Sequence, residues 1–274
     1  MKFYIITPTY NRPQELMRCL GSVLVQNFLD WEMIIVNDSP RYDYSIFEKN
    51  LATNPKIKYY KNEKNMGVNF SRNFVLDYIN ERSLKYNLKI KKEEAVNKNI
   101  CSKYIIFLDD DDWLEANALQ NMENILNIKN INWLITNRAK PEGASLSNIR
   151  KENISNFNLE FLLLRKSSGD VTHTIEKSIA LSSRFSKKVK QGEEWIYFSN
   201  LNNPITYENI NTTISNGYSD EGLNNYMSIQ DKRYKIKNLC NLFLERLDSS
   251  STLSSKILTL IYIFLRILKT LAVR

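Results

Sequence analysis

The strongest constraint on the fold is the alternation of short apolar runs with amphipathic segments near the start of the chain. Pro13 suits the first turn of a helix, and Leu16, Leu20, Val23 and Leu24 after it share one helical face. Residues 69–79 predict a second helix. The runs expected to form strands are residues 3–6, 33–36, 57–60, 104–108 and 133–136. This β-α-β-α-β order predicts an α/β fold with a mainly parallel sheet flanked by helices.

Polar clusters follow several of these apolar runs. Residues 7–11, 37–40 and 109–112 each begin where a predicted strand ends. Ligands of parallel α/β sheets bind outside the carboxyl ends of the strands, so these clusters mark the expected site. Two further segments carry weaker signals. Residues 81–103 are strongly charged and predict a helical extension or surface insertion, and residues 141–158 predict a loop.

Four consecutive aspartates, Asp109 to Asp112, are the sharpest chemical signal. Neighbouring carboxylates repel one another, and a hard divalent cation such as Mg²⁺ relieves that repulsion while also binding a substrate diphosphate. A solvent-facing acidic turn or helix N-terminus explains the acids equally well. The apolar strand before them and Trp113-Leu114 after them favour a binding site.

Composition excludes several other chemistries. Three widely spaced cysteines give no CxxC motif, which argues against a disulfide framework or a thiolate zinc site and fits a reducing cytosol. The chain has one histidine, His173, so a two-histidine metal site is excluded. No glycine-rich phosphate loop and no signal peptide are recognisable.

Four motifs, taken together and in order, resemble those of the family 2 glycosyltransferases, which have the GT-A fold. They are Ile6-Thr7-Pro8-Thr9-Tyr10-Asn11-Arg12, Val36-Asn37-Asp38-Ser39, Asn65-Met66-Gly67 with Arg72-Asn73, and Phe107-Leu108-Asp109-Asp110-Asp111-Asp112. The resemblance is strong over residues 3–115 and weaker to about residue 200. It implies an inverting transferase that uses a nucleotide-diphosphate sugar, with a UDP-sugar favoured, and Mn²⁺ or Mg²⁺.

The resemblance also implies roles for individual residues. Asp111, with Asp109, is expected to bind the metal, matching the family's D-x-D motif. The residues expected around the donor nucleotide are Pro8, Thr9, Tyr10, Asp38, Asn65, Arg72, Asp109 and Asp110. Two departures from the family pattern stand out, because Asn37 replaces a frequent aspartate and the middle residue of D-x-D is itself acidic. The metal ligand is therefore not assigned uniquely.

Each of these residues also has a structural interpretation. Tyr10 can pack against the first helix, and Asn65-Met66-Gly67 can be an ordinary turn. Arg72 can form an ion pair with the aspartates. Asp38 can accept hydrogen bonds from a following turn. The sequence leaves both interpretations open for each position.

An inverting transfer needs a general base that takes a proton from the acceptor hydroxyl. Gly192-Glu193-Glu194-Trp195 resembles the acidic pair that supplies this base in the family. Glu194 aligns with the base and Glu193 with its neighbour, although the family residue is an aspartate. The alternative is a helix N-terminus with two favourable acids. His173, upstream of the pair, is a weaker candidate for contact with the acceptor, diphosphate or metal.

The net charge of +8 is concentrated at the C-terminal end. Nine basic and two acidic residues lie in residues 232–274, which leaves 29 basic and 28 acidic residues before them. On a helical wheel, Lys256, Arg266, Lys269 and Arg274 oppose an arc of Leu, Ile and Phe side chains. This pattern predicts an amphipathic helix over residues 253–274 on an anionic membrane surface, or alternatively one packed on protein.

We therefore expect a GT-A domain over residues 1–224 and a basic helical extension over residues 225–274. The expected activity is sugar transfer to a hydroxyl of a saccharide or lipid-linked acceptor in bacterial surface glycan synthesis. The expected location is the inner face of the cytoplasmic membrane. The alternative is a catalytically silent GT-A scaffold. The nearly neutral body argues against nucleic acid, and the oligomeric state is left open.

Overall fold

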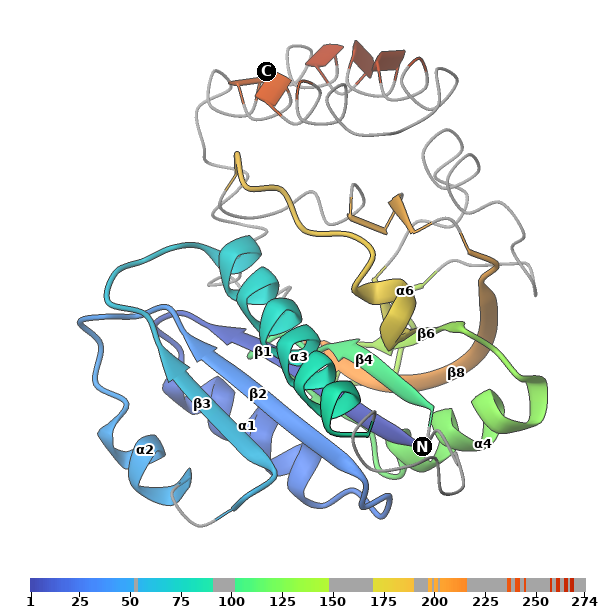
Figure 1. Cartoon of the computed structure of the whole chain (residues 1–274), viewed down its shortest axis with the longest axis horizontal. Helices are drawn as coiled ribbons and strands as arrows, with labels where there is room; N and C mark the ends of the chain where they lie inside the picture. The colour runs from blue at the N-terminus through green and yellow to red at the C-terminus, as the bar shows by residue number, and fades with distance from the viewer. Residues whose placement is uncertain are drawn as a thin grey trace.

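A computed structural model describes residues 1–51, 54–90, 102–147, 170–189 and 203–215, with shorter pieces at 197–198, 200–201 and at positions between 236 and 268. In this described part, helices cover both faces of an eight-stranded sheet (Figure 1). The strands are β1 (Lys2–Thr9), β2 (Trp31–Asn37), β3 (Ile57–Lys61), β4 (Lys103–Phe107), β5 (Asp112–Leu114), β6 (Trp133–Ala139), β7 (Val171–Glu176) and β8 (Thr206–Ser215). The helices are α1 (Pro13–Leu24), α2 (Ser45–Leu51), α3 (Val68–Ile90), α4 (Ala118–Lys129) and α6 (Lys177–Ala180).

The strand order across the sheet is β3-β2-β1-β4-β7-β6-β8-β5. The first four strands in this order are all parallel. Strand β7 is antiparallel to its neighbours β4 and β6, β8 is parallel to β6, and β5 is antiparallel to β8. The predicted α/β class is confirmed. The parallel arrangement holds for β1 to β4, and the sheet as a whole is mixed.

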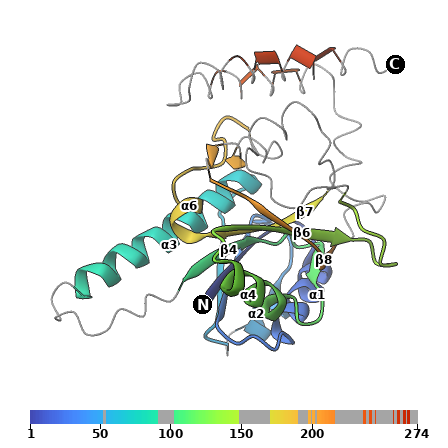
Figure 2. The same ribbon diagram turned by 90° about the vertical axis from the view of Figure 1, so that its right-hand side faces the viewer.

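Strand β1 occupies the middle of the parallel part and is buried over seven of its eight residues. Its side chains alternate between two cores. Tyr4 and Ile6 pack with α3 and α6 on one face, while Phe3 and Ile5 pack with α1, α2 and α4 on the other (Figure 2). A continuous apolar run is what a strand covered on both faces requires.

Turn chemistry sets where α1 and α3 begin. Asn11 has a φ of 57°, which turns the chain between β1 and α1, and Pro13 then fits the first turn of α1. Leu16, Leu20 and Val23 are buried, as the periodicity predicts. Gly67 has a φ of 91° and directly precedes α3, a backbone angle that a residue with a side chain adopts at a cost.

The strand runs expected from the sequence all fall within or overlap observed strands, and α3 continues past the predicted end at residue 79 to Ile90. The helical extension is thus confirmed to Ile90, whereas residues 91–101 lie outside the described residues. The predicted loop is confirmed over residues 141–147. Strands β5, β7 and β8 were not among the predicted elements. The expected boundary between residues 224 and 225 lies outside the described residues.

Candidate donor and metal site

The loops after β1, β2 and β4 meet at the carboxyl edge of the parallel strands. The Asp38 amide donates to the Thr9 carbonyl (2.9 Å), and the Asn11 amide donates to Ser39 Oγ (2.6 Å). Thr9 Oγ1 donates to Asp110 Oδ2 at 2.7 Å. The parallel strands therefore bring these three sequence motifs into direct contact, as their positions at strand ends predict. The fourth motif joins them through Gly67, which bonds Asp38, and Arg72, which bonds Asp109.

The four aspartates separate into two kinds by exposure. The side chains of Asp110 and Asp112 are 1% and 2% exposed, whereas those of Asp109 and Asp111 are 34% and 16% exposed. Asp112 begins β5 and pairs with Ser215 in the sheet, which draws it inward. The accessible pair is thus the first and third residue of the run, the spacing of D-x-D.

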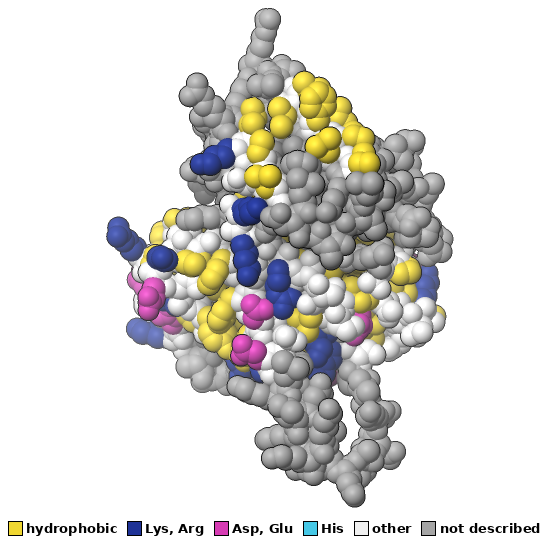
Figure 3. Space-filling model, turned by 45° about the horizontal axis from the view of Figure 1, so that its top comes forward, with side chains coloured by type: hydrophobic (Ala, Val, Ile, Leu, Met, Phe, Trp, Pro, Cys, Tyr) yellow, Lys and Arg dark blue, Asp and Glu magenta, His cyan; other side chains and the backbone are white. Residues whose placement is uncertain are grey.

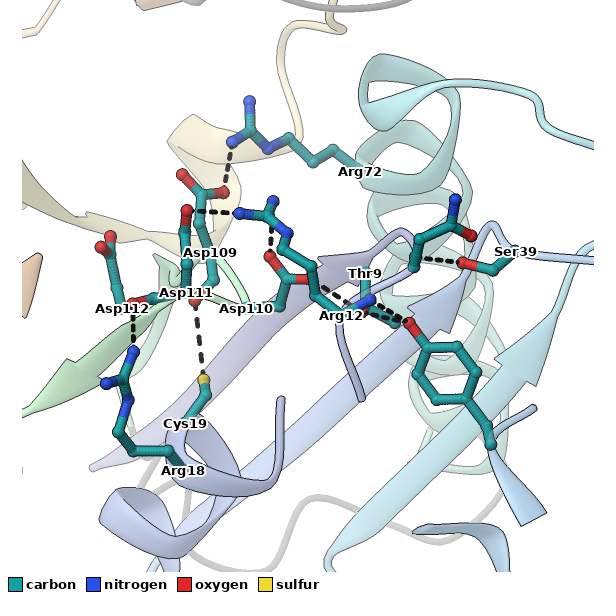
Figure 4. Close-up of polar contacts among 12 residues, drawn as sticks. Thr9, Arg12, Arg18, Cys19, Ser39, Arg72, Asp109, Asp110, Asp111 and Asp112 are labelled. Carbon is teal, nitrogen blue, oxygen red and sulfur yellow. Dashed lines mark hydrogen bonds and ion pairs between the residues drawn. The ribbon is translucent and has the colours of Figure 1, made fainter. Parts of the chain in front are cut away.

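Three arginines, Arg12, Arg72 and Arg138, form ion pairs with these carboxylates. Figure 4 shows the contacts of Arg12 and Arg72. Arg12 donates from Nη2 to Asp110 Oδ1 at 2.8 Å and from Nη1 to Asp111 Oδ2. Arg138 Nη1 lies 2.7 Å from Asp112 Oδ2. The repulsion that the acidic run predicts is therefore offset largely by guanidinium groups of the protein itself.

Burial separates the acids electrostatically as well. Burial raises the pKa of Asp110 to about 8, and the nearby Arg12 only partly offsets it. Burial likewise raises the pKa of Asp112 to about 7 against the opposing effect of Arg138. The side chains of these two acids lie inside the protein, and the expected contact of Asp110 with the donor stays a prediction.

Arg72 contacts Asp109, the member of the accessible pair that Arg12 does not bond. Its Nη2 donates to Asp109 Oδ1 at 2.7 Å, and its guanidinium carbon lies 5.2 Å from the centre of the Phe185 ring. Burial would raise the pKa of Asp109, but Arg72 and Arg138 outweigh it and lower that pKa. The ion pair that the sequence left open for Arg72 is therefore present.

Asp38 is buried and accepts three hydrogen bonds within the chain. Its Oδ1 accepts from Asn62 Nδ2 and from the Met66 amide, both at 2.8 Å, and its Oδ2 accepts from the Gly67 amide at 2.6 Å. These bonds fix the turn that contains Asn65 and leads into α3. The structural interpretation of Asp38 is thus realised, and its contact with a nucleotide base stays a prediction.

The three residues expected at the nucleotide from β1 and its loop differ in exposure. Thr9 is 2% exposed, and its hydroxyl bonds Asp110 and the Tyr44 hydroxyl (2.9 Å). Pro8 is buried within β1. Tyr10 is 48% exposed at the rim. Tyr10 is therefore the exposed member of the three, and the contacts of all three residues with a nucleotide stay predictions.

The sequence model for the family described as "Glycosyl transferase family 2" matches residues 4–189, which is more than half of the chain. The chain belongs to glycosyltransferase family 2. The match contains all four motifs quoted above and the three arginines of the site.

Curated relatives of this family 2 chain include a Rickettsia bellii "Uncharacterized glycosyltransferase", 28% identical over 73% of the chain and 27% of the relative. A second, from Campylobacter jejuni, is named "GalNAc(5)-diNAcBac-PP-undecaprenol beta-1,3-glucosyltransferase" and is 25% identical over 72% of the chain and 58% of the relative. The Escherichia coli protein WfgD, a "UDP-Glc:alpha-D-GlcNAc-diphosphoundecaprenol beta-1,3-glucosyltransferase", is 27% identical over 48% of the chain and 44% of the relative. The chain thus spans between about a quarter and three fifths of these relatives.

Solved structures confirm the GT-A fold. Staphylococcus aureus TarS in complex with UDP-GlcNAc superposes with a TM-score of 0.64 at 16% identity, covering 98% of this chain and 72% of that one. The mannosyltransferase PcManGT from Pyrobaculum calidifontis, in complex with GDP-Man and Mn²⁺, gives a TM-score of 0.57 at 11% identity, with the same coverage of both chains.

The accessible carboxylates of this family 2 chain fit a divalent cation, such as Mg²⁺, that binds together with the phosphate groups of a substrate. Within the described residues, no three His, Cys, Asp or Glu side chains are grouped as a complete metal site. Mg²⁺ commonly takes one or two carboxylates and completes its shell with water and phosphate oxygens. Asp109 and Asp111 are the two carboxylates accessible for that arrangement.

The predicted catalytic pair, Glu193 and Glu194, lies outside the described residues. The chain on both sides of the pair is fixed to the core. The Val189 carbonyl accepts a hydrogen bond from Asn69 Nδ2 (3.2 Å), and the Tyr197 hydroxyl donates to the Ala180 carbonyl (2.7 Å). The assignment of the base therefore stays a prediction from the sequence.

His173 lies inside β7, buried between aromatic rings. Its Nδ1 accepts a hydrogen bond from Trp133 Nε1 (3.2 Å), and its ring stacks on Phe198 with centres 3.8 Å apart. Burial, with Arg138 nearby, lowers its pKa to about 3. These contacts are those of a structural histidine, and its predicted contact with substrate is not tested by them.

Three residues of the site were not singled out from the sequence. Arg12 belongs to a quoted motif, and its basic character beside an acidic cluster was an available signal. Arg138 lies just beyond the apolar run of β6, and only the sheet topology brings it to Asp112. Tyr44 reaches Thr9 from the loop before α2. Nothing in the local pattern around Tyr44 or Arg138 indicates those contacts.

Proposed function

We propose that this family 2 chain transfers a sugar from a nucleotide-diphosphate sugar to a hydroxyl of a saccharide or lipid-linked acceptor, with inversion, in bacterial surface glycan synthesis. The observation that carries the proposal is the exposure of Asp109 and Asp111 at the carboxyl edge of the parallel strands, the edge at which the exposed Tyr10 follows β1. A UDP-sugar is the favoured donor. The named TarS complex with UDP-GlcNAc and the two undecaprenol-linked relatives support this choice of substrates.

In the proposed reaction, Asp109 and Asp111 would hold Mn²⁺ or Mg²⁺ together with the donor diphosphate. The cation supplies Lewis-acid stabilisation of the charge that develops on the leaving diphosphate. Tyr10 would contact the nucleotide, and Arg72 would keep Asp109 oriented. Glu194 would take the proton of the acceptor hydroxyl as that oxygen attacks the anomeric carbon from the side opposite the diphosphate.

Two experiments test the activity. Donor sugars with UDP or GDP, supplied with Mn²⁺, should raise the melting temperature of the protein if they bind its native form. Asp111→Asn should then lower transfer from the stabilising donor by about 10²- to 10³-fold, as the removal of one electrostatic group does elsewhere. Asp77→Asn, in an exposed ion pair with Arg184 on the surface, is the control and should retain full activity. A chain that no donor stabilises and that turns over none is the silent scaffold instead.

We further propose that residues 225–274 form an extension that binds the inner, anionic face of the cytoplasmic membrane. Seven of its described apolar residues are each more than two fifths exposed, whereas Ile236 and Ile267 are half-buried. The exposed ones are Leu244, Ile257, Leu260, Ile261, Phe264, Leu265 and Leu268. Hydrophobic side chains gather over this segment (Figure 3). From Ile257 to Leu268 their spacing puts them on one helical face, opposite Lys256, Arg266 and Lys269 in the sequence. Among the described residues, no helix has both the length and the apolar character to cross a membrane.

Liposome flotation tests the membrane proposal. Deletion of residues 249–274 should release the protein from vesicles that contain phosphatidylglycerol, while donor binding is retained. Phe264→Asp should weaken the same binding, because it places a charge on the exposed apolar face. Lys140→Gln, an exposed change in the body, is the matched control. Undiminished flotation of the deletion variant would show that the body binds the vesicles.

A further inference from the structure

Both accessible carboxylates of the D-x-D pair are already bonded to arginine. Arg72 bonds Asp109, and Arg12 bonds Asp111 as well as the buried Asp110. A divalent cation that uses Asp109 and Asp111 therefore competes with guanidinium groups for the same oxygen atoms. The net charge of the site is nearly the same with and without ligand, because the charge of the divalent cation is balanced by that of the diphosphate that binds with it.

The two arginines differ in how firmly their side chains are held. Arg72 is 6% exposed and lies against the Phe185 ring. Arg12 is 24% exposed, and two of its nitrogen atoms each contact a different aspartate. Of the two, Arg12 has the side chain that can leave Asp111 and reach another anion at the same rim.

The backbone of Arg12, in contrast, is fixed by a closed ring of hydrogen bonds. Its amide donates to the Tyr44 hydroxyl (3.0 Å), which contacts Thr9 Oγ1 (2.9 Å), and Thr9 donates to Asp110. Arg12 Nη2 closes the ring by donating to the same Asp110. The main chain of Arg12 is thus held without the contact to Asp111. The bond from Arg12 Nη2 to Asp110 can persist when the bond from Nη1 to Asp111 is broken.

Resting on the function proposed above, we propose that Arg12 is an exchange residue. Its guanidinium neutralises Asp111 until the donor binds, then releases Asp111 to the divalent cation and binds the donor diphosphate while it keeps Asp110. Arginine is suited to this exchange because its donors match carboxylate and phosphate oxygens equally well. No covalent bond is made or broken in this step. Arg12 therefore opposes the cation alone and favours the nucleotide.

Opposite effects on two ligands give the test. Arg12→Met keeps the length of the side chain and removes its charge. Mn²⁺ binding to the protein without nucleotide, measured from the free Mn²⁺ signal in electron paramagnetic resonance, should become about tenfold tighter. UDP binding at saturating Mn²⁺, measured by calorimetry, should become about tenfold weaker, as expected for the loss of one charge-assisted hydrogen bond.

Two further variants serve as controls for this experiment. Arg18→Met is the matched control, because Arg18 contacts the Asp111 carbonyl (3.2 Å) and the Trp113 ring but frees no carboxylate when removed. It should change neither affinity by more than about twofold. Arg12→Lys keeps the charge and should bind Mn²⁺ as the wild type does, which gives a measurement if Arg12→Met unfolds.

The outcomes separate the two proposals. If the wild type binds UDP with Mn²⁺ but Arg12→Met leaves Mn²⁺ affinity unchanged or weakens it together with UDP, Arg12 is a structural ion pair and the exchange is wrong. The exchange role would also be contradicted if Arg12→Lys bound Mn²⁺ as tightly as Arg12→Met does. If the wild type binds neither UDP nor GDP at saturating Mn²⁺, the proposed function itself is wrong.

Discussion

Two regions of the sheet carry their polar side chains in different ways. In the parallel region, β1 to β4, the middle of each strand is mainly apolar and most polar groups stand at or next to the strand ends. In the region of β6, β7 and β8, polar side chains lie inside the sheet. Thr136 bonds Thr212 at 2.6 Å, Thr172 bonds Thr213 at 2.8 Å, and Asn137 accepts from the Tyr207 hydroxyl at 2.8 Å.

The difference indicates a division of labour. The parallel region keeps its hydrogen-bonding groups at one edge, where they can meet a ligand. The second region uses hydroxyl and amide pairs to bind its strands to one another, and through Arg138 it braces Asp112 and approaches Asp109 (3.9 Å). A buried polar group must be paired to avoid a large cost, so this region is the more sensitive to single substitutions.

The sharpest test of the division concerns the predicted base, Glu194, which lies between β7 and β8 in the sequence. Glu194→Gln should lower the rate of transfer by about 10³-fold, because the acceptor hydroxyl loses its general base. UDP affinity should stay unchanged, since the base acts on the acceptor and not on the nucleotide. Steady-state transfer and calorimetry measure the two quantities.

Glu193→Gln is the matched control for that experiment. It should cost less than tenfold in rate if Glu194 is the base. A larger loss in the Glu193 variant would reassign the base to the neighbouring residue. Full turnover by both variants would contradict the single-displacement mechanism with this acidic pair.

A smaller effect is expected at the contact between the two regions. Arg138→Met leaves the buried Asp112 carboxylate without its 2.7 Å partner, and we expect a loss of about 3 kcal/mol in the free energy of unfolding. Urea denaturation measures it. Lys140→Met breaks an exposed pair with Glu142 and should cost less than about 1 kcal/mol. Equal losses in both variants would show that Arg138 does not brace the sheet.

The same contrast explains what the sequence could predict. Apolar strands such as residues 3–6 and 33–36 stand out because nothing polar interrupts them. The stretch Val171–Glu176 has the consecutive residues Thr-His-Thr between Val171 and Ile175, and Thr206–Ser215 contains three asparagine or glutamate residues, so neither has a clear apolar run. The partners of their polar groups come from strands distant in sequence. Periodicity within one segment cannot reveal such pairing.

The site divides in the same way. The accessible pair of Asp109 and Asp111 was predicted, because a family motif and a strand end coincide there. The arginines that form ion pairs with the four aspartates were not predicted as partners of particular aspartates. Arg12 is 99 residues from Asp111, and Arg138 reaches Asp112 through the order of β6, β8 and β5 in the sheet. Contacts of this kind depend on topology, and one sequence holds no local record of them.

The smallest predicted effect is a difference in how the two regions respond to acid. His173 has its pKa lowered to about 3 by burial, so the unfolded chain binds a proton that the folded chain does not between about pH 6.5 and 3. Stability from this residue is therefore lost as the pH falls from 7, by about 2 kcal/mol at pH 5. Asp110 and Asp112 have raised pKa values, and they act in the opposite direction because the folded chain then binds the additional protons.

His173→Phe isolates the histidine contribution. The wild type and this variant contain the same acids, so the acid contribution cancels in the difference between their unfolding free energies. The chain has one histidine, so the remaining pH dependence of that difference comes from His173. The variant loses the acceptor of Trp133 Nε1 and should be less stable at pH 7, but its disadvantage should shrink by about 2 kcal/mol at pH 5. Urea titrations at both pH values measure this change. A constant difference would mean that His173 binds its proton at the same pH in the folded and the unfolded chain, which would contradict its lowered pKa and the hydrogen bond that Nδ1 accepts from Trp133.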